Sequence, residues 1–353
     1  MRILITGGCG FVGSNLSVSL KKEFPSYEII VFDNLKRRGS ELNINRLKAE
    51  GIIFVHGDIR NEEDLESLPI VDFIIDASAE PSVIAGMQGA HKQLININLN
   101  GTINILNLAL KYNSAFIFLS TSRVYPIESI NQICFNEVET RFTISKNQQN
   151  LGVSMDGISE NFPLDGYRSI YGATKLASEL IIQEYTHFLG LRSVINRCGV
   201  IAGPYQMGKV DQGVTVLWLA KHYWKKELNY IGFGGTGKQV RDILHVDDLS
   251  ELIIRQVRDI NLFNGKMFNV GGGLKSSLSL MELTVLCQKI TGNIIPIKSQ
   301  IDDRIADIRV YITDNTKITN ICDWQPNKTP FDIVNDIYKW LVQNENELAN
   351  ILN

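Results

Sequence analysis

"ILITGGCGFVGS", residues 3–14, is a short apolar run that passes directly into a stretch with glycine at positions 7, 10 and 13. An apolar run without alternation is typical of a strand buried on both faces. Glycine after such a strand permits a tight turn and a close approach of the backbone to its neighbours. The residues from Phe11 onward have a helical pattern, so the stretch predicts a strand, a glycine turn and a helix in succession.

The same alternation continues through the first third of the chain. Further apolar runs typical of buried strands lie at residues 28–33, 52–58, 71–78 and 115–122. Helical candidates separate them at residues 11–24, 61–68 and 94–112. Alternating strands and helices predict an α/β fold of Rossmann type, in which a doubly wound parallel sheet has right-handed crossovers.

The rest of the chain has a different character. Residues 126–166 are polar and lack sustained periodicity, and a long segment of this kind inside a compact domain is often functional. A strong helical pattern runs from Tyr171 to Gly190, and the pattern after residue 200 is mixed. We therefore expect a Rossmann domain over residues 1–200 and a smaller, interlocked α+β domain over residues 201–353, with an approximate boundary.

Composition narrows the class of protein. The chain has 353 residues, of which 44% are hydrophobic and 21% charged, and its net charge is −3. These values are typical of a globular enzyme and argue against nucleic acid as a partner. The five cysteines include no CxxC pair and the five histidines no metal-ligand spacing, so we expect neither disulfides nor a metal site. No signal-peptide pattern and no apolar segment of roughly 20 residues is present, so we expect a cytoplasmic protein that does not enter the membrane.

The glycine turn also has a chemical interpretation. A helix that begins after such a turn presents backbone N–H groups and the positive end of its dipole, which suit a pyrophosphate. The second strand ends in Asp33, twenty residues after Gly13, where a carboxylate accepts hydrogen bonds from ribose hydroxyls and repels a 2′-phosphate. This favours NAD over NADP, although an ordinary turn is the alternative and Arg37 and Arg38 leave room for a 2′-phosphate. Asp58 is placed either to reach the adenine or to cap its loop.

Tyr171 and Lys175 lie four residues apart in "YGATK" and share one face of the predicted helix. A phenol with its unperturbed pKa of about 10 is a poor base at neutral pH. A cation one turn away stabilises the phenolate and lowers that pKa, so the pair is suited to acid–base catalysis. An incidental pair on a surface helix is the alternative.

Together, the glycine motif, Asp33, "LSTS" at 119–122 and "YGATK" resemble the extended short-chain dehydrogenase/reductases that act on nucleotide sugars. The resemblance covers nearly the whole chain. It implies a catalytic trio of Thr121, Tyr171 and Lys175, in which Tyr171 takes the sugar hydroxyl proton while hydride leaves the same carbon. It also implies a homodimer or homotetramer, because the family forms a four-helix bundle between two subunits. The predicted cofactor-binding residues are Gly7, Gly10, Phe11, Val12, Asp33, Asn34, Asp58, Ile59, Ala77, Ser120, Tyr171, Lys175 and Arg197.

The residues after Thr121 distinguish among the reactions of this family. Dehydratases carry an Asp-Glu pair at these positions, and nucleotide-glucuronate decarboxylases carry a glutamate. This chain has Ser122 and Arg123 instead. Epimerisation and simple reduction need only reversible oxidation at one carbon, and both stay open.

The second half of the chain, with "KVDQG", "GKQVRDILHVDDL" and "DNTKITNICDWQP", closely resembles the CDP-paratose 2-epimerases, also called CDP-tyvelose epimerases. The resemblance implies oxidation at C2 of a CDP-3,6-dideoxyhexose with tightly held NAD, return of hydride to the opposite face, and a role in O-antigen or other lipopolysaccharide biosynthesis. Residues 77–87 and "VYPIES" at 124–129 differ from that group. A 4-epimerase or 4-reductase of a UDP-, GDP- or dTDP-sugar is therefore an alternative, and a dinucleotide-sensing protein without catalysis is another.

The predicted substrate-binding residues are Ser122, Arg123, Asp211, Gln212, Arg241 and Arg304. The resemblance implies that Arg241 and Arg304 contact the diphosphate, and a guanidinium suits this role because it binds two phosphate oxygens at once. An ion pair with Asp242 is the alternative for Arg241, and loop capping is the alternative for Asp211 and Gln212.

Other polar residues near these motifs are expected to be structural. Asp307 and Arg309 should form an ion pair. His245 should cap or pair with the carboxylates of "VDD", and Asn98 should pack between helices near the active site.

Overall fold

The structure is a computed structural model that describes residues 1–83, 86, 89–208 and 212–352. The chain divides into two compact units that alternate along the sequence. The first unit comprises Met1–Val124, Ser169–Cys198 and Leu249–Phe268, and the second comprises Tyr125–Arg168, Gly199–Asp248 and Asn269–Asn353. The units therefore do not follow a single boundary near residue 200. They are similar in size, so the second region is larger than we predicted.

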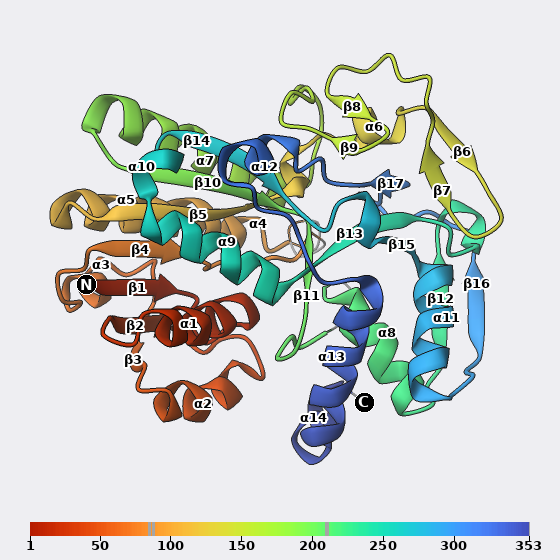
Figure 1. Ribbon diagram of the computed structural model, residues 1–353, viewed down its shortest axis with the longest axis horizontal. Coiled ribbons are helices and arrows are strands. Elements are labelled where there is room, and N and C mark those ends of the chain that lie inside the picture. The colour runs from red at the N-terminus through yellow and green to blue at the C-terminus, as the bar shows by residue number, and fades with distance from the viewer. Residues whose placement is uncertain (84–85, 87–88, 209–211, 353) are drawn as a thin grey trace. The chain divides into compact units, whose positions relative to one another are not determined.

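The first unit is built on a parallel sheet, which confirms the predicted fold class. Seven strands are ordered β14-β10-β5-β4-β1-β2-β3 (Figure 1). Their bounds are β1 Arg2–Thr6, β2 Glu28–Asp33, β3 Ile53–His56, β4 Phe73–Asp76, β5 Ala115–Thr121, β10 Ser193–Cys198 and β14 Lys266–Val270. The order reverses between β1 and β4, and in open α/β sheets ligands bind outside the carboxyl ends of the strands at this point.

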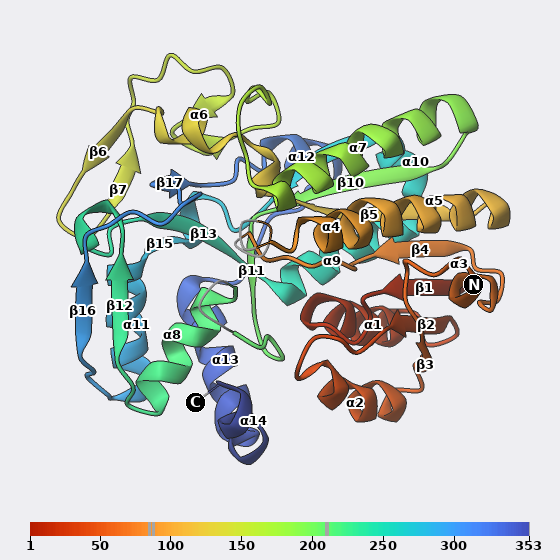
Figure 2. The ribbon, with the colours of Figure 1, turned by 180° about the vertical axis from the view of Figure 1, so that it is seen from behind.

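Helices cover both faces of this sheet. They are α1 Phe11–Glu23, α2 Asn43–Ala49, α3 Glu62–Glu66, α4 His91–Ile95, α5 Gly101–Tyr112, α7 Ile170–Leu189, α9 Val246–Arg258 and α10 Ile260–Phe263, with the 3₁₀ turns η1 Ser40–Leu42 and η4 Ser122–Val124 and the π-helical turn η3 Asn96–Asn100. Alternate strand residues such as Leu4, Ile74 and Phe116 pack in one core with Ile105 of α5 and Ile182 of α7. The helices α1 and α9 lie in front of the sheet in Figure 1, and α5 and α7 lie in front of it in Figure 2.

The second unit combines small sheets with helices. Its strands are β6 Phe135–Glu137, β7 Phe142–Ile144, β8 Val153–Ser154, β9 Gly157–Ile158, β11 Val200–Ala202, β12 Leu228–Ile231, β13 Val240–His245, β15 Ser277–Ser279, β16 Ile297–Gln300 and β17 Val310–Tyr311. Its helices are α6 Ile127–Asn131, α8 Val214–Tyr223, α11 Leu280–Thr291, α12 Thr316–Cys322, α13 Pro330–Gln343 and α14 Glu345–Leu352, with the 3₁₀ turns η5 Phe233–Gly235 and η6 Leu274–Ser276. Strand β13 joins β11, β15 and β17 in one sheet.

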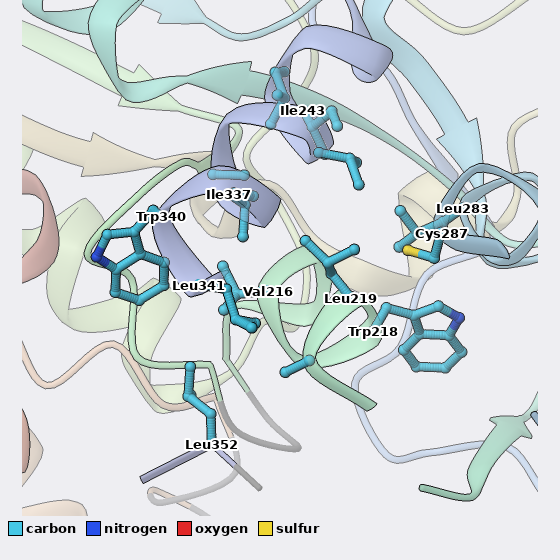
Figure 3. Close-up of a cluster of buried hydrophobic side chains, with 14 of the residues drawn as sticks. Val216, Trp218, Leu219, Ile243, Leu283, Cys287, Ile337, Trp340, Leu341 and Leu352 are labelled. Carbon is cyan, nitrogen blue, oxygen red and sulfur yellow. The ribbon is translucent and has the colours of Figure 1, made fainter. Parts of the chain in front are cut away.

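The core of the second unit lies where three of its helices meet. Figure 3 shows Trp218 and Leu219 of α8 near Leu283 and Cys287 of α11, with Ile337 and Trp340 of α13 in the same cluster. Complete burial of such apolar side chains stabilises a fold by roughly 1.5–3 kcal/mol each. Every helix in the described part of the chain is too short or too polar to span a bilayer.

Candidate active site

The glycine turn after β1 lies against the end of β4. Gly7 has φ +63°, and a Cβ there would lie 2.8 Å from the carbonyl oxygen of Ala77. A Cβ on Gly13 would lie 2.3 Å from the carbonyl oxygen of Gly7, so the first turn of α1 packs directly on the loop. These two positions therefore require glycine.

Helix α1 begins immediately after this turn, with Gly10 as its N-cap. No side chain caps the first turn, and no acidic residue lies in it. Gly7, Gly10, Phe11 and Val12 are each partly accessible. The N–H groups at the N-terminus of such a helix suit a pyrophosphate, so the residues present fit a dinucleotide.

Asp33 ends β2 beside the same turn. Its carboxylate accepts hydrogen bonds from the backbone N–H of Cys9 at 3.0 Å and of Leu35 at 2.8 Å. Burial raises the pKa of Asp33, and these hydrogen bonds oppose the rise. A carboxylate oxygen can accept further hydrogen bonds, so Asp33 remains suited to ribose hydroxyls.

Asn34 and Asp58 form a second polar pair at this edge. The Asn34 amide donates to Asp58 at 2.8 Å, and Arg60 binds the same carboxylate with two nitrogens at 2.8 and 2.6 Å. Hydrogen bonds from Arg60 are the main reason that the pKa of Asp58 is lowered. Ile59 is buried beside Gly101, which places it behind this edge.

Tyr171 lies in the first turn of α7, which Ser169 caps by accepting a hydrogen bond from the N–H of Gly172 at 3.2 Å. Its phenol is hydrogen-bonded to the hydroxyl of Thr121 at the end of β5. Thr121 Oγ1 accepts from the backbone N–H of Arg123 at 3.2 Å, which leaves the hydroxyl proton for the phenol oxygen. The structure thus brings together two of the three residues predicted to be catalytic.

The third, Lys175, is buried on the same helix. Its ammonium donates to the carbonyl oxygen of Leu119 at 3.0 Å and lies 4.3 Å from the ring centroid of Phe118. Burial lowers the pKa of Lys175, while the negative charge of Asp76 opposes this effect.

The protein groups alone do not favour the phenolate form of Tyr171 at neutral pH. Burial raises the pKa of Tyr171 to about 12, and the hydrogen bond from Thr121 only partly offsets this. Two charged residues also act on it: Arg123 lowers the pKa and Glu80 raises it.

Ser120 and Arg197 require a correction. Arg197 was predicted to contact the cofactor, but its side chain is 1% exposed and pairs with the fully buried Glu179. Ser120, predicted to lie beside the cofactor, donates to the same carboxylate at 2.5 Å. Neither side chain is directed to a ligand, because both are bound to Glu179 in the core.

Arg241 lies on β13 in the second unit. Its guanidinium donates to Asp307 at 2.8 Å and to the carbonyl oxygen of Val240 at 2.7 Å. The partner is therefore Asp307, and the alternative pairing with Asp242 is wrong. Asp242 is completely buried and accepts from the N–H of Gly273 at 3.0 Å.

Arg309 corrects a second pairing. It was expected to bind Asp307, which instead binds Arg241. The guanidinium of Arg309 lies 4.1 Å from the ring centroid of Phe135 and 5.1 Å from that of Phe233, so it is held by cation–π contacts.

The other predicted substrate residues are placed as follows. Ser122 and Arg304 are half-buried, and Gln212 is half-buried just before α8. Asp211 lies outside the described residues. His245 accepts from the N–H of Asp247 at 3.0 Å and so caps the start of α9, as expected.

Asn98 and Glu80 form an arrangement that the sequence did not reveal. Asn98 is fully buried in the π-helical turn η3, and its amide accepts from the N–H of Glu80 at 2.8 Å and donates to its carbonyl at 3.1 Å. The same amide donates to Thr174 of α7 at 3.3 Å. Asn98 therefore fixes Glu80 against the helix that carries Tyr171. A π-turn of this kind leaves no distinct sequence pattern, although such turns are frequent at functional sites.

This geometry, a glycine turn at the switch point of a parallel sheet beside a Tyr–Thr–Lys trio, defines a dinucleotide-dependent enzyme of the extended short-chain dehydrogenase/reductase class. Residues 3–271 match the NAD dependent epimerase/dehydratase family, and the chain belongs to that family. Its cofactor is NAD, and the predictions of an enzyme and of this cofactor are confirmed.

Individual relatives support the same assignment. CDP-paratose 2-epimerase of Salmonella typhi is 35% identical, over 96% of this chain and 99% of that protein, which confirms the resemblance. UDP-glucose 4-epimerase of Bacillus subtilis is 25% identical over 98% of both chains. The crystal structure of dTDP-glucose 4,6-dehydratase from Bacillus anthracis in complex with NAD is 25% identical, with a TM-score of 0.76 over 98% of both chains.

Proposed function

We propose that this chain is a nucleotide-sugar epimerase that acts at C2 of a CDP-3,6-dideoxyhexose, interconverting sugars of the CDP-paratose and CDP-tyvelose type. The observation that carries the proposal is the 35% identity to CDP-paratose 2-epimerase over nearly the full length of both chains. The side chains at Ser122 and Arg123 also support it, because elimination of water needs an acid and a base that these positions do not provide.

The proposed reaction uses the trio around Tyr171. The phenolate of Tyr171 removes the proton of the C2 hydroxyl, and Thr121 donates a hydrogen bond to the reacting oxygen. NAD held at the glycine turn by residues such as Gly7, Gly10 and Asp33 would supply a reversible hydride acceptor, which allows oxidation at C2 and reduction of the 2-keto sugar on its opposite face after that sugar has turned. Tyr171 then gives the proton back, so that no cofactor is consumed.

The resting protein holds the pKa of Tyr171 at about 12. A rate at neutral pH therefore requires positive charge beyond that of Arg123, and a bound nicotinamidium carries such a charge. Lys175 would hold the nicotinamide ribose in this proposal. Burial of the trio excludes water and so strengthens each of these electrostatic effects.

Substrate binding is assigned in the same proposal. Ser122 and Arg123 would contact the sugar, and Arg241 and Arg304 the diphosphate. Arg241 would then leave Asp307 and bind two phosphate oxygens, so its guanidinium would stay paired with negative charge. Asp211 and its neighbour Gln212 would bind the base or the sugar.

We further propose that the protein is cytoplasmic and forms a homodimer or homotetramer, and that its product serves O-antigen or other lipopolysaccharide biosynthesis. These statements rest on the resemblance to the epimerases.

The test is to incubate the protein with a panel of CDP-, UDP-, GDP- and dTDP-sugars and to follow products by NMR in ordinary and deuterated water. We expect inversion at C2 of a CDP-dideoxyhexose without solvent deuterium at that carbon, because the same hydride returns. Incorporation of deuterium at C2 would overturn the mechanism. Tyr171→Phe should bind NAD as the wild type does and show no turnover.

A 4-epimerase is the second candidate, favoured by the similarity to UDP-glucose 4-epimerase. The same panel separates the two, because inversion at C4 of a UDP-sugar has a different product spectrum. A reductase would release its cofactor in each cycle, so NAD that survives dialysis of the purified protein favours either epimerase.

A further inference from the structure

Three buried side chains from three elements meet beneath the trio. Arg197 of β10 binds Glu179 of α7 through Nε at 3.1 and 3.0 Å to the two carboxylate oxygens and through Nη2 at 2.7 Å. Ser120 of β5 donates to the same carboxylate at 2.5 Å. The ion-paired side chains are 1% and 0% exposed.

The position of Ser120 links this cluster to the reacting groups. The preceding residue, Leu119, accepts the hydrogen bond from the Lys175 ammonium, and the following residue, Thr121, is bound to Tyr171. Glu179 lies one helical turn beyond Lys175 on α7. Arg197 is paired with Ser120 in the register of β10 and β5.

A buried ion pair is weak evidence for stability, because desolvation of the two charges offsets most of their attraction. An apolar pair of similar volume would stabilise the core as well. The cluster does provide two things that an apolar pair does not. Glu179 makes directional links from α7 to Ser120 of β5 and to Arg197 of β10, and the ion pair balances the charge beside Lys175.

We propose that Ser120, Glu179 and Arg197 form a positioning triad that fixes β5 against α7 and keeps the charge beneath Tyr171 and Lys175 balanced. The proposal rests on the proposed roles of Tyr171 and Lys175. The three residues are positioning residues, since they act through Thr121, Lys175 and Tyr171.

Other charged and titratable groups also face these two residues. Tyr171 is influenced by Cys198 at the end of β10, by Arg123 of η4 and by Glu80. Lys175 is influenced by Asp76 of β4, by Cys198 and by Glu179. Apart from Glu179 itself, all of these groups are unchanged in the variants below, so a shift in the pH profile can be attributed to the triad.

The test is the pH profile of turnover in charge variants. Arg197→Met leaves the Glu179 carboxylate unpaired, which disfavours the phenolate, so we expect the rise in rate to move to higher pH and the rate at pH 7 to fall at least tenfold. Glu179→Gln leaves the guanidinium unpaired and should move the rise to lower pH. The double variant restores neutrality and should return the profile to its original midpoint, with a reduced kcat.

Equal losses of rate with an unchanged midpoint in both single variants would overturn the proposal, since a purely structural role predicts that result. Arg2→Met is the matched control, because it breaks the Arg2–Glu28 ion pair at the other end of β1, and it should leave the profile unchanged. If Arg197→Met does not fold, Arg197→Lys keeps the charge and should reduce kcat without moving the midpoint. A moved midpoint in that variant would also count against the triad.

A readout without substrate separates this inference from the proposed function. The absorbance of the Tyr171 phenolate, identified by its loss in Tyr171→Phe, can be titrated in the NAD-loaded protein. The midpoint of this titration should move to higher pH in Arg197→Met and to lower pH in Glu179→Gln. If no nucleotide sugar is converted but these shifts occur, the proposed function fails and the triad stands. If turnover is found and the midpoints do not move, the triad fails alone.

Discussion

Tyr171 is the residue on which the proposed chemistry depends, and two residues of opposite charge act on it. Arg123 lowers its pKa and Glu80 raises it, while burial holds it at about 12. Of the two, Glu80 lies in residues 77–87, one of the stretches that the sequence comparison found to differ from the CDP-paratose 2-epimerase pattern.

Arg123→Gln should therefore raise the pKa of Tyr171 and move the rise in turnover to higher pH. Glu80→Gln should lower it and move the rise to lower pH. One pKa unit corresponds to about 1.4 kcal/mol and a rate change of about tenfold on the rising limb, and we expect shifts up to this size. The measurement is kcat against pH, with Lys111→Gln as a control at the far end of α5. Shifts of the same sign in the two variants would contradict the interpretation.

Asp33 gives a second prediction at this scale. Asp33→Asn keeps an acceptor for the N–H groups of Cys9 and Leu35 but removes the charge, so affinity for NAD should fall roughly tenfold or more, as expected for loss of a hydrogen bond to a charged group. Discrimination against NADP should weaken as the repulsion disappears. Calorimetric titration with both cofactors checks this. Unchanged preference for NAD would show that Asp33 does not face the ribose.

The local motifs could be predicted because spacing alone defines them. The glycine motif contains Gly7 and Gly13 within a few residues, and one turn fixes their geometry. In the same way, one helix fixes the geometry of Tyr171 and Lys175. The Ser120–Glu179 contact joins residues 59 positions apart and depends on the packing of α7 on β5. For the same reason Arg197 was assigned to the cofactor although it lies in the core.

At the scale of elements, the apolar strands were predictable and the polar segment was not. Each strand of the central sheet from β1 to β10 overlaps an apolar run of the sequence. Residues 126–166 looked structureless, yet they contain α6 and the hairpins β6–β7 and β8–β9. These strands have two or three residues each, too few for alternation to show.

The π-turn η3 is the element that fixes Glu80 to α7, and Asn98 is the residue through which it acts. Asn98→Leu would leave the N–H of Glu80 without its acceptor, which costs about 1–3 kcal/mol in unfolding free energy. We also expect kcat to fall, because Glu80 would no longer be held near Tyr171. Asn100→Leu in the same turn is the control, since that side chain is exposed and binds Asn96. Equal destabilisation by both changes, measured by urea unfolding, would contradict this role.

For the whole molecule, the two units show why a boundary could not be placed by composition. The chain crosses between units at residues 124, 168, 198, 248 and 268, and each crossing falls at or close to a regular element rather than in a glycine- or proline-rich linker. Composition marks linkers, so it cannot mark a crossing of this kind.

The assembly gives the last prediction, and it concerns the exposed side of α7. Leu180, Phe188 and Leu189 are 55%, 71% and 56% exposed on this helix in the isolated chain. If α7 lies at the proposed subunit interface, these side chains are buried by the partner copy, and Leu180→Glu introduces a charge that must lose water there. We expect wild type to sediment as a dimer or larger species at micromolar concentration and Leu180→Glu to shift toward monomer. Ile294→Glu, at an 85% exposed position of the second unit, should leave the assembly unchanged. A wild-type protein that sediments only as a monomer, or a Leu180→Glu variant that assembles as tightly as wild type, would exclude α7 from the interface.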